Sequence, residues 1–107
     1  MSYYTSYEIT VKGDVSDVVK DAITLNMEKL VLPEYNEWMG GWACYGNWYE
    51  HEEDMKELSL KFPDIVFDVY GDGEETEDLW HKYFKNGKMQ YCPVRFEFDD
   101  FDESKLE

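Results

Sequence analysis

The dipeptide Asn86-Gly87 is the feature that most constrains how this 107-residue chain can fold. Asn-Gly suits a two-residue hairpin turn in which both residues have positive φ, so the flanking runs are expected to pair as antiparallel strands. The first run is Leu79–Lys85. In the second, apolar residues alternate with polar ones as far as Phe98, and Pro93 favours an edge position or a bulge because proline has no N–H to donate.

Periodicity predicts the elements at the start of the chain. Apolar and polar residues alternate over Tyr7–Val11, which is typical of a half-buried strand. Apolar residues then recur at helical spacing over Val15–Leu30. Asp14 can cap this helix and Pro33 is expected to stop it, so the chain should begin with a strand followed by a helix.

The middle of the chain is less regular. Aromatic residues and three glycines over residues 33–47 predict a loop that leads into a short strand from Trp42 to Tyr49. Acids crowd the start of Glu50–Lys61 and lysines come later, a distribution that suits a helix dipole. A buried strand is then expected over Ile65–Tyr70, followed by an acidic loop over Gly71–Asp78.

The predicted fold is α+β and ferredoxin-like, an antiparallel sheet with two helices on one face and an extra C-terminal hairpin strand. Each helix has one apolar stripe and most strands have one apolar face, as this arrangement requires. Hydrophobic residues make up 43% of the chain, so it has the material for one core. One domain over residues 1–98 and an acidic tail over 99–107 are expected.

The net charge of −15 is the most unusual property of the composition. Such a chain repels nucleic acid phosphates and anionic lipid, and is drawn to basic protein surfaces. It has no long apolar run or basic leader, which predicts a cytoplasmic protein. Cys44 and Cys92 match no zinc, thioredoxin or haem spacing and indicate a reduced pair.

No motif specifies a catalytic, metal or cofactor site. His51 lacks the second histidine of a zinc-protease helix, and the acids after Gly71 match a calcium loop only in part. Those acids would also repel a phosphate. Asp68 interrupts an apolar run, but alternation favours an outward-facing residue; a pocket gathering Asp68, His81 and Tyr83 would favour an enzyme.

The aromatic segment from Trp38 to Tyr49 has three interpretations. Its side chains pack in the core, stack on nucleobases, or anchor a protein contact. Core packing is favoured because the apolar area must be buried, and stacking on RNA is disfavoured because no lysine or arginine is interleaved. Trp38, Trp42 and Tyr45 are the candidate anchors if the segment contacts a partner.

Several motifs in the second half of the chain carry a family resemblance. They are Trp48-Tyr49, His51-Glu52-Glu53-Asp54-Met55, Leu58-Ser59, Phe62-Pro63-Asp64, Gly71-Asp72-Gly73-Glu74-Glu75 and Lys82-Tyr83-Phe84-Lys85-Asn86-Gly87-Lys88. This pattern resembles the ferredoxin-like domain of the YubB-like group of phage and mobile-element proteins. The resemblance implies a phage or conjugative origin and the same fold. It brings no catalytic residues, because that family has no agreed activity.

These observations lead to one hypothesis and one alternative. The hypothesis is a non-enzymatic counter-defence protein whose carboxylates compete with phosphate for a basic host complex, such as a CRISPR effector; small acidic phage proteins that inhibit host defence provide the analogy. The alternative is a small adaptor or ligand-binding module with a solvated acidic face. No cofactor is expected. The candidate partner-binding acids are Asp72, Glu74, Glu75, Glu77, Asp78, Asp99, Asp100, Asp102 and Glu103.

Overall fold

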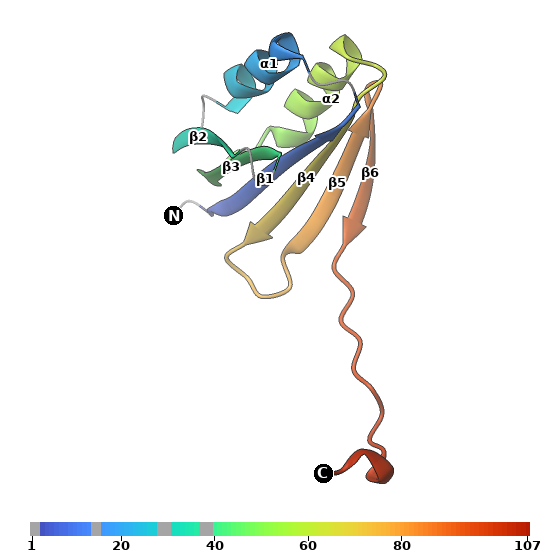
Figure 1. Ribbon diagram of the computed structural model, residues 1–107. Helices are drawn as coiled ribbons and strands as arrows, with labels where there is room; N and C mark the ends of the chain where they lie inside the picture. Colours follow the sequence, from blue (N-terminus) through green and yellow to red (C-terminus); the bar gives the residue numbers. More distant parts are fainter. Residues whose placement is uncertain (1–2, 14–15, 28–30, 37–39) are drawn as a thin grey trace.

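The computed structural model describes residues 3–13, 16–27, 31–36 and 40–107, with the backbone alone for residues 31–36. Its elements follow one another along the chain (Figure 1). They are β1 (Thr5–Lys12), α1 (Asp17–Met27), β2 (Val31–Asn36), β3 (Gly41–Gly46), α2 (His51–Lys61), β4 (Val66–Gly73), β5 (Leu79–Lys85), β6 (Lys88–Pro93) and the short 3₁₀ helix η1 (Glu103–Lys105).

The strands form one open antiparallel sheet in the order β2-β3-β1-β4-β5-β6, so the α+β class with an antiparallel sheet is confirmed. Each helix connects two strands that have one other strand between them. Helix α1 connects β1 to β2, with β3 between them, and α2 connects β3 to β4, with β1 between them. The hairpin of β5 and β6 then extends the sheet beyond β4.

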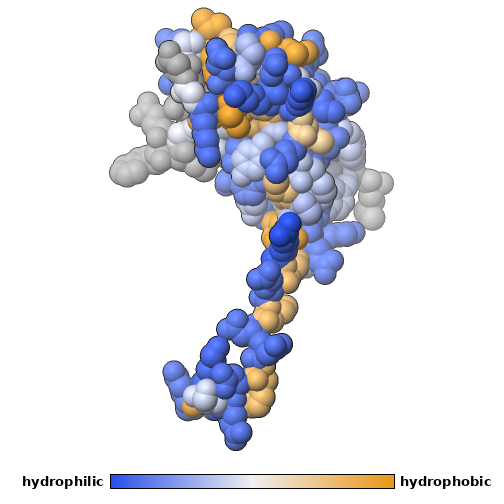
Figure 2. Space-filling model, turned by 90° about the vertical axis from the view of Figure 1, so that its right-hand side faces the viewer, coloured by the Kyte–Doolittle hydropathy of each residue, from blue (hydrophilic) through white to orange (hydrophobic). Residues whose placement is uncertain are grey.

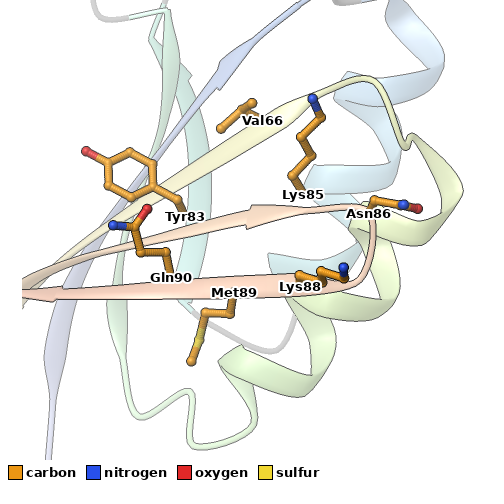
Figure 3. A pocket seen from close by; sticks show the side chains of 7 residues that line it. All are labelled: Val66, Tyr83, Lys85, Asn86, Lys88, Met89 and Gln90. Carbon is orange, nitrogen blue, oxygen red and sulfur yellow. The ribbon is translucent and has the colours of Figure 1, made fainter.

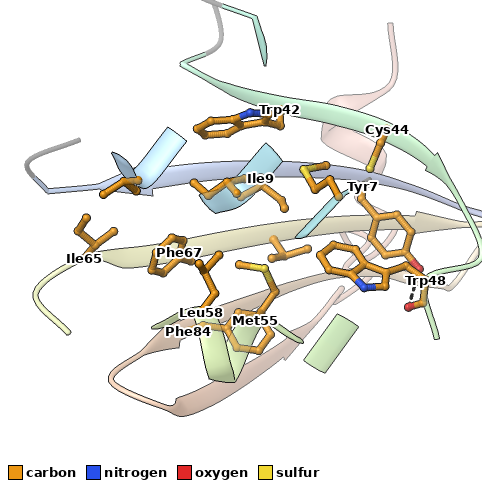
Figure 4. Packing of buried hydrophobic residues seen from close by; sticks show 14 of the residues in the cluster. Tyr7, Ile9, Trp42, Cys44, Trp48, Met55, Leu58, Ile65, Phe67 and Phe84 are labelled. Carbon is orange, nitrogen blue, oxygen red and sulfur yellow. Dashed lines mark hydrogen bonds between the residues drawn. The ribbon is translucent and has the colours of Figure 1, made fainter. Parts of the chain in front are cut away.

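Both helices cover the same face of the sheet (Figure 1), and the core lies between the helices and the sheet. Alternate residues of β1, β3, β4 and β5 point to this face, among them Ile9, Phe67 and Phe84, which are fully buried. Met55 and Leu58 of α2 pack against them (Figure 4). The other face has no helix over it among the described residues, and we call it the open face.

The turn between β5 and β6 is the one that its sequence predicts. Asn86 has φ of 50° and Gly87 has φ of 78°, the signs that a type I′ hairpin needs. The Gly87 N–H donates a hydrogen bond of 2.8 Å to the Ser59 hydroxyl of α2, which ties the turn to the helix layer. Strand β6 lies at the edge of the sheet and ends at Pro93, so the edge position expected from proline is confirmed.

Three local predictions need correction. The segment between the helices contains β2 and β3 where the sequence indicated a loop and one strand. Pro33 lies inside β2, at a register irregularity of this edge strand, and does not stop the helix. The last strand ends at Pro93 instead of Phe98. The predicted cap Asp14 and the predicted helix end at Leu30 lie outside the described residues.

After Pro93 the chain leaves the sheet and extends away from it (Figure 1). We call residues 94–107 the C-terminal segment. Val94 keeps one backbone hydrogen bond to Leu79, and the residues beyond it are exposed as far as the end of the chain. None of the helices in the described part of the chain has the length and apolar character needed to cross a membrane.

Candidate functional site

The strand register gathers three parts of the chain at one end of the sheet. Thr5 of β1 pairs with Gly73 of β4, and Trp80 of β5 pairs with Pro93 of β6. The start of β1, the β4–β5 connection and the start of the C-terminal segment therefore lie together, and Figure 1 shows this arrangement. We call this the loop end of the sheet; the β5–β6 turn lies at the opposite, hairpin end.

The acidic loop, Asp72 to Asp78, begins inside β4, because this strand continues to Gly73 instead of ending at Tyr70 as the sequence indicated, and its other residues connect β4 to β5 at the loop end. Asp72, Glu74, Glu75 and Glu77 are exposed. Asp78 is half-buried and has a structural partner, because the Tyr3 hydroxyl donates a hydrogen bond of 2.6 Å to its Oδ2. The same hydroxyl accepts a hydrogen bond from the Glu75 N–H. Tyr3 therefore fixes the shape of the loop while the other four carboxylates remain in solvent.

The acids of the C-terminal segment are also exposed: Asp99, Asp100, Asp102 and Glu103. Sequence alone left open whether they and the acidic loop come from opposite ends of the sheet. The segment begins at the loop end, so both groups extend from the same end, although the four acids lie farther along the chain. Asp102 caps η1 by accepting hydrogen bonds from Ser104, which lowers the pKa of its carboxyl.

Tyr45 and Asp72 share the open face at the loop end. Both residues lie opposite Ser6 of β1, Tyr45 from β3 and Asp72 from β4, and all three are exposed. Strands two positions apart are separated by about 10 Å. The Tyr45 ring stacks on Tyr4 with 5.5 Å between centroids. The structure therefore brings one predicted aromatic residue close to the predicted acids.

Trp42, the other predicted anchor that the structure describes, is not on this surface. Trp42 is 1% exposed and packs in the core, where its Nε1–H donates to the Thr24 hydroxyl at 3.2 Å. Trp48 is buried as well, whereas Tyr49 is exposed at the loop end. Trp38 lies outside the described residues. Within the described part of the segment, the favoured core interpretation holds for the tryptophans and an anchoring role stays open for the tyrosines.

The acids at the start of α2 have partners inside the protein. Asp54 accepts a hydrogen bond of 2.7 Å from the Trp48 indole. Glu52 lies 2.8 Å from the Lys82 ammonium, and this hydrogen bond lowers the pKa of its carboxyl. These contacts add to the helix-dipole explanation that the sequence suggested, and they separate both acids from the exposed ones of the acidic loop.

Lys82 is the polar residue that sequence reasoning missed. It points to the helix-covered face between Trp80 and Phe84 and is 8% exposed. Besides Glu52, its Nζ donates to His51 Nε2 at 2.7 Å and lies 4.2 Å from the Trp80 ring centroid. The available signal was the alternation of β5, which places Lys82 on the same side as its two large apolar neighbours.

His51 completes this network as a neutral ring. Its Nδ1–H donates to the Trp48 carbonyl at 2.9 Å, which leaves Nε2 to accept from Lys82. Burial lowers the pKa of His51, and the adjacent ammonium of Lys82 lowers it further. No buried polar side-chain atom in the described part of the protein lacks a hydrogen-bond partner, and the contacts of Lys82 with His51 and Glu52 join β5 to α2.

Asp68, His81 and Tyr83 do come together, on the open face. His81 Nδ1 lies 2.8 Å from Asp68 Oδ1, and the Tyr83 ring stacks on the histidine with 5.9 Å between centroids. A hollow of about 300 Å³ is lined by Asp68 and His81 together with Glu8, Thr10 and Tyr70. This pair can hold a ligand by hydrogen bonds, but no described nucleophile is hydrogen-bonded to His81.

The described cysteines and acids do not gather into a cluster of metal ligands. Among the described residues no group of three or more histidine, cysteine, aspartate or glutamate side chains could hold a metal ion. Cys44 and Cys92 are free thiols in different environments. Cys44 is buried, and burial raises the pKa of its thiol to about 12, whereas Cys92 is half-buried on β6.

Comparison of the chain with protein-family models, with curated proteins and with solved structures finds no match. The resemblance to the YubB-like group therefore stays a prediction from sequence motifs. The site has to be interpreted from the chemistry of its own residues.

Proposed function

We propose that this protein is a non-enzymatic binding protein of phage or mobile-element origin. Its acidic loop end would occupy a basic surface on a nucleic-acid-handling host complex, with the cytoplasm of the host cell as its location. The strand order, with each helix crossing over one intervening strand, favours a ferredoxin-like fold extended by a hairpin. On this fold the loop end forms a compact surface from which the acids project.

The observation that carries the proposal is that four carboxylates of the acidic loop have no ion pair within the described part of the protein. In the described part of the chain, none of the carboxylates of Asp72, Glu74, Glu75 and Glu77 forms an ion pair with a lysine or arginine. Close like charges destabilise a folded protein unless something offsets them. By contrast, Glu52 and Asp54 are neutralised or hydrogen-bonded within the fold.

The chemistry of this surface complements a basic site on a partner protein that normally binds phosphates. Solvated carboxylates carry the same sign of charge as a nucleic acid backbone, so they attract the same lysines and arginines. Tyr45 adds an exposed ring on the same face as Asp72, about 10 Å away. Tyrosine is enriched at the centres of protein interfaces. A host complex with a basic nucleic-acid channel, such as a CRISPR effector, is the class of partner that fits.

The test is a competition assay with purified CRISPR effectors. Each effector is mixed with a fluorescent DNA or RNA target, and displacement of the target by the acidic protein is followed by anisotropy. The control variant carries Asp72→Asn, Glu74→Gln, Glu75→Gln and Glu77→Gln, all at exposed positions. We expect the wild-type protein to displace the nucleic acid from at least one effector, and the variant to need at least a tenfold higher concentration.

Two results would contradict the proposal. If no effector in a broad panel is displaced, the counter-defence role is wrong. If the variant displaces the target as well as the wild-type protein does, the acidic loop is not the binding surface.

The hollow on the open face favours a ligand-binding module as a second candidate. Its polar groups converge there, because Glu8, Asp68 and His81 all line it. In this case a small molecule should bind the purified protein, and His81→Ala should abolish that binding. Native mass spectrometry of the purified protein distinguishes the two candidates, since a retained small ligand adds a discrete mass.

A further inference from the structure

The C-terminal segment exposes aromatic side chains that nothing in the described protein covers. Phe98 is 89% exposed and Phe101 is 80% exposed. Figure 2 shows apolar residues alternating with hydrophilic ones along the segment. Exposed apolar side chains gathered on a short stretch mark an interaction site more often than a solvated surface. A surface that covers these rings should be apolar, with positive charge around it because carboxylates flank the rings.

Such a surface exists at the hairpin end of the same protein. An open pocket of about 600 Å³ is lined by Val66 and Tyr83 together with Lys85 and Lys88 (Figure 3). Met89 also borders it, although the Met89 side chain points to the other side of β6 and packs against the core. Pockets of this size accept aromatic groups.

The rim of this pocket is basic in a chain that is otherwise strongly acidic. Lys12 lies opposite Val66 on the open face and adds a third ammonium beside the pocket. Asp68, opposite Tyr83 on the same face, is already hydrogen-bonded to His81. The hairpin end therefore offers an apolar pocket with lysines around it, which complements phenylalanines flanked by carboxylates.

We propose that the C-terminal segment of one molecule docks in the hairpin-end pocket of a second copy of this chain. Phe98 and Phe101 fill the pocket, while Asp99 and Asp100 face Lys85 and Lys88. The segment leaves the sheet at the loop end and the pocket lies at the hairpin end, the length of β6 away. Two copies that exchange their segments form a closed dimer, because each molecule supplies one segment and one pocket.

This arrangement goes beyond the proposed function and leaves the acidic loop free. The segment acids then contact lysines of the second copy, while Asp72, Glu74, Glu75 and Glu77 remain exposed for a basic partner. Because carboxylates and ammonium groups meet at the rim of the pocket, the dimer should weaken as the salt concentration rises.

The test uses sedimentation equilibrium of the full-length chain and two variants with complementary defects. The tail variant carries Phe98→Ser and Phe101→Ser, and the pocket variant carries Lys85→Glu and Lys88→Glu. All four residues are exposed, so both variants should fold. We expect the wild-type chain to dimerise, and each variant alone to dimerise at least about a hundredfold more weakly.

Mixing the two variants identifies the contact. The pocket variant keeps an intact segment and the tail variant keeps an intact pocket, so an equimolar mixture should form a heterodimer through one of the two contacts. A wild-type chain that stays monomeric up to millimolar concentration overturns the proposal, and so does a mixture that stays monomeric. A tail variant that dimerises as well as the wild type also overturns it, since the phenylalanines would then not be the anchors.

Discussion

Replacing Trp42 with alanine tests whether the aromatic segment belongs to the core or to a binding surface. The Trp42 side chain is 1% exposed and packs with Ile9 and other core residues on the helix-covered face. Removing a buried tryptophan costs about 3–5 kcal/mol, because apolar contacts are lost and a cavity remains. Loss of the hydrogen bond to Thr24 adds to this cost. We expect the free energy of unfolding to fall by at least 3 kcal/mol, on the order of the lower bound for such substitutions.

The assay is urea unfolding followed by far-UV circular dichroism, with Tyr45→Ala as the matched control. Tyr45 comes from the same strand, but it is half-exposed and its main contact is the stacked ring of Tyr4. Its removal should cost at most about 1 kcal/mol. For a domain of this size, the Trp42 variant should also unfold roughly 12–40 °C below the wild type.

The result that would refute this reasoning is a Trp42→Ala variant within about 1 kcal/mol of the wild type, which is the range of surface substitutions. Trp42 would then not be a core residue, and its role as an anchor would return. Equal costs for Trp42→Ala and Tyr45→Ala would refute the division of the segment into a buried and an exposed side.

Other predictions concern the buried network, the packing of β4 and the thiols. The pKa of His51 is lower in the folded than in the unfolded protein, so the contribution of His51 to stability should be fully present above a pH of about 6.5 and should fall as the pH drops towards the folded pKa. Urea titrations at several pH values should show this decrease in the wild type, and His51→Gln should lose it. Gly71→Ala should lower the melting temperature through a cost of about 1–3 kcal/mol, since an added methyl group collides with the Trp80 ring; an unchanged melting temperature would contradict this packing. A thiol reagent should modify Cys92 in the native protein and Cys44 only after unfolding, and mass spectrometry of the modified peptides checks this order.

Local chemistry predicted the elements that depend on neighbouring residues alone. The Asn86-Gly87 turn was predictable because few other dipeptides adopt positive φ at both positions. Strand β1 and helix α2 were predictable from their periods and from the acids at the helix start. In each case a short stretch of sequence carries the whole signal.

The segment between the helices could not be predicted in this way. Pro33 normally argues against a strand, and only its place at an irregularity of an edge strand makes β2 compatible with it. The orientation of Trp42 and Tyr45 on opposite faces of β3 depends on which side the helices cover, which is a tertiary property. The sequence identified these aromatic residues, but it could not show which of them are buried and which are exposed.

The candidate site was predicted in its composition and not in its geometry. The acids of the loop were identified correctly as exposed, except that Asp78 is held by Tyr3. The acidic loop and the start of the C-terminal segment lie at the same end of the sheet because of the strand order. Periodicity in the sequence does not determine that order. The pairing of Lys82 with Glu52 and His51 joins residues about 30 positions apart, so reasoning from neighbouring residues missed both the burial of this lysine and its partners.

The most direct test of the central claim compares two variants of equal charge. One neutralises the acidic loop at Asp72, Glu74, Glu75 and Glu77, and the other neutralises four exposed acids elsewhere: Asp21, Glu53, Glu57 and Asp64. The dissociation constant for the host complex displaced in the competition assay is measured from low to high salt. We predict that the loop variant binds at least about tenfold more weakly and depends less on salt, while the second variant stays close to the wild type. Equal weakening of both variants would show that net charge alone drives binding, and would contradict a phosphate-like site at the acidic loop.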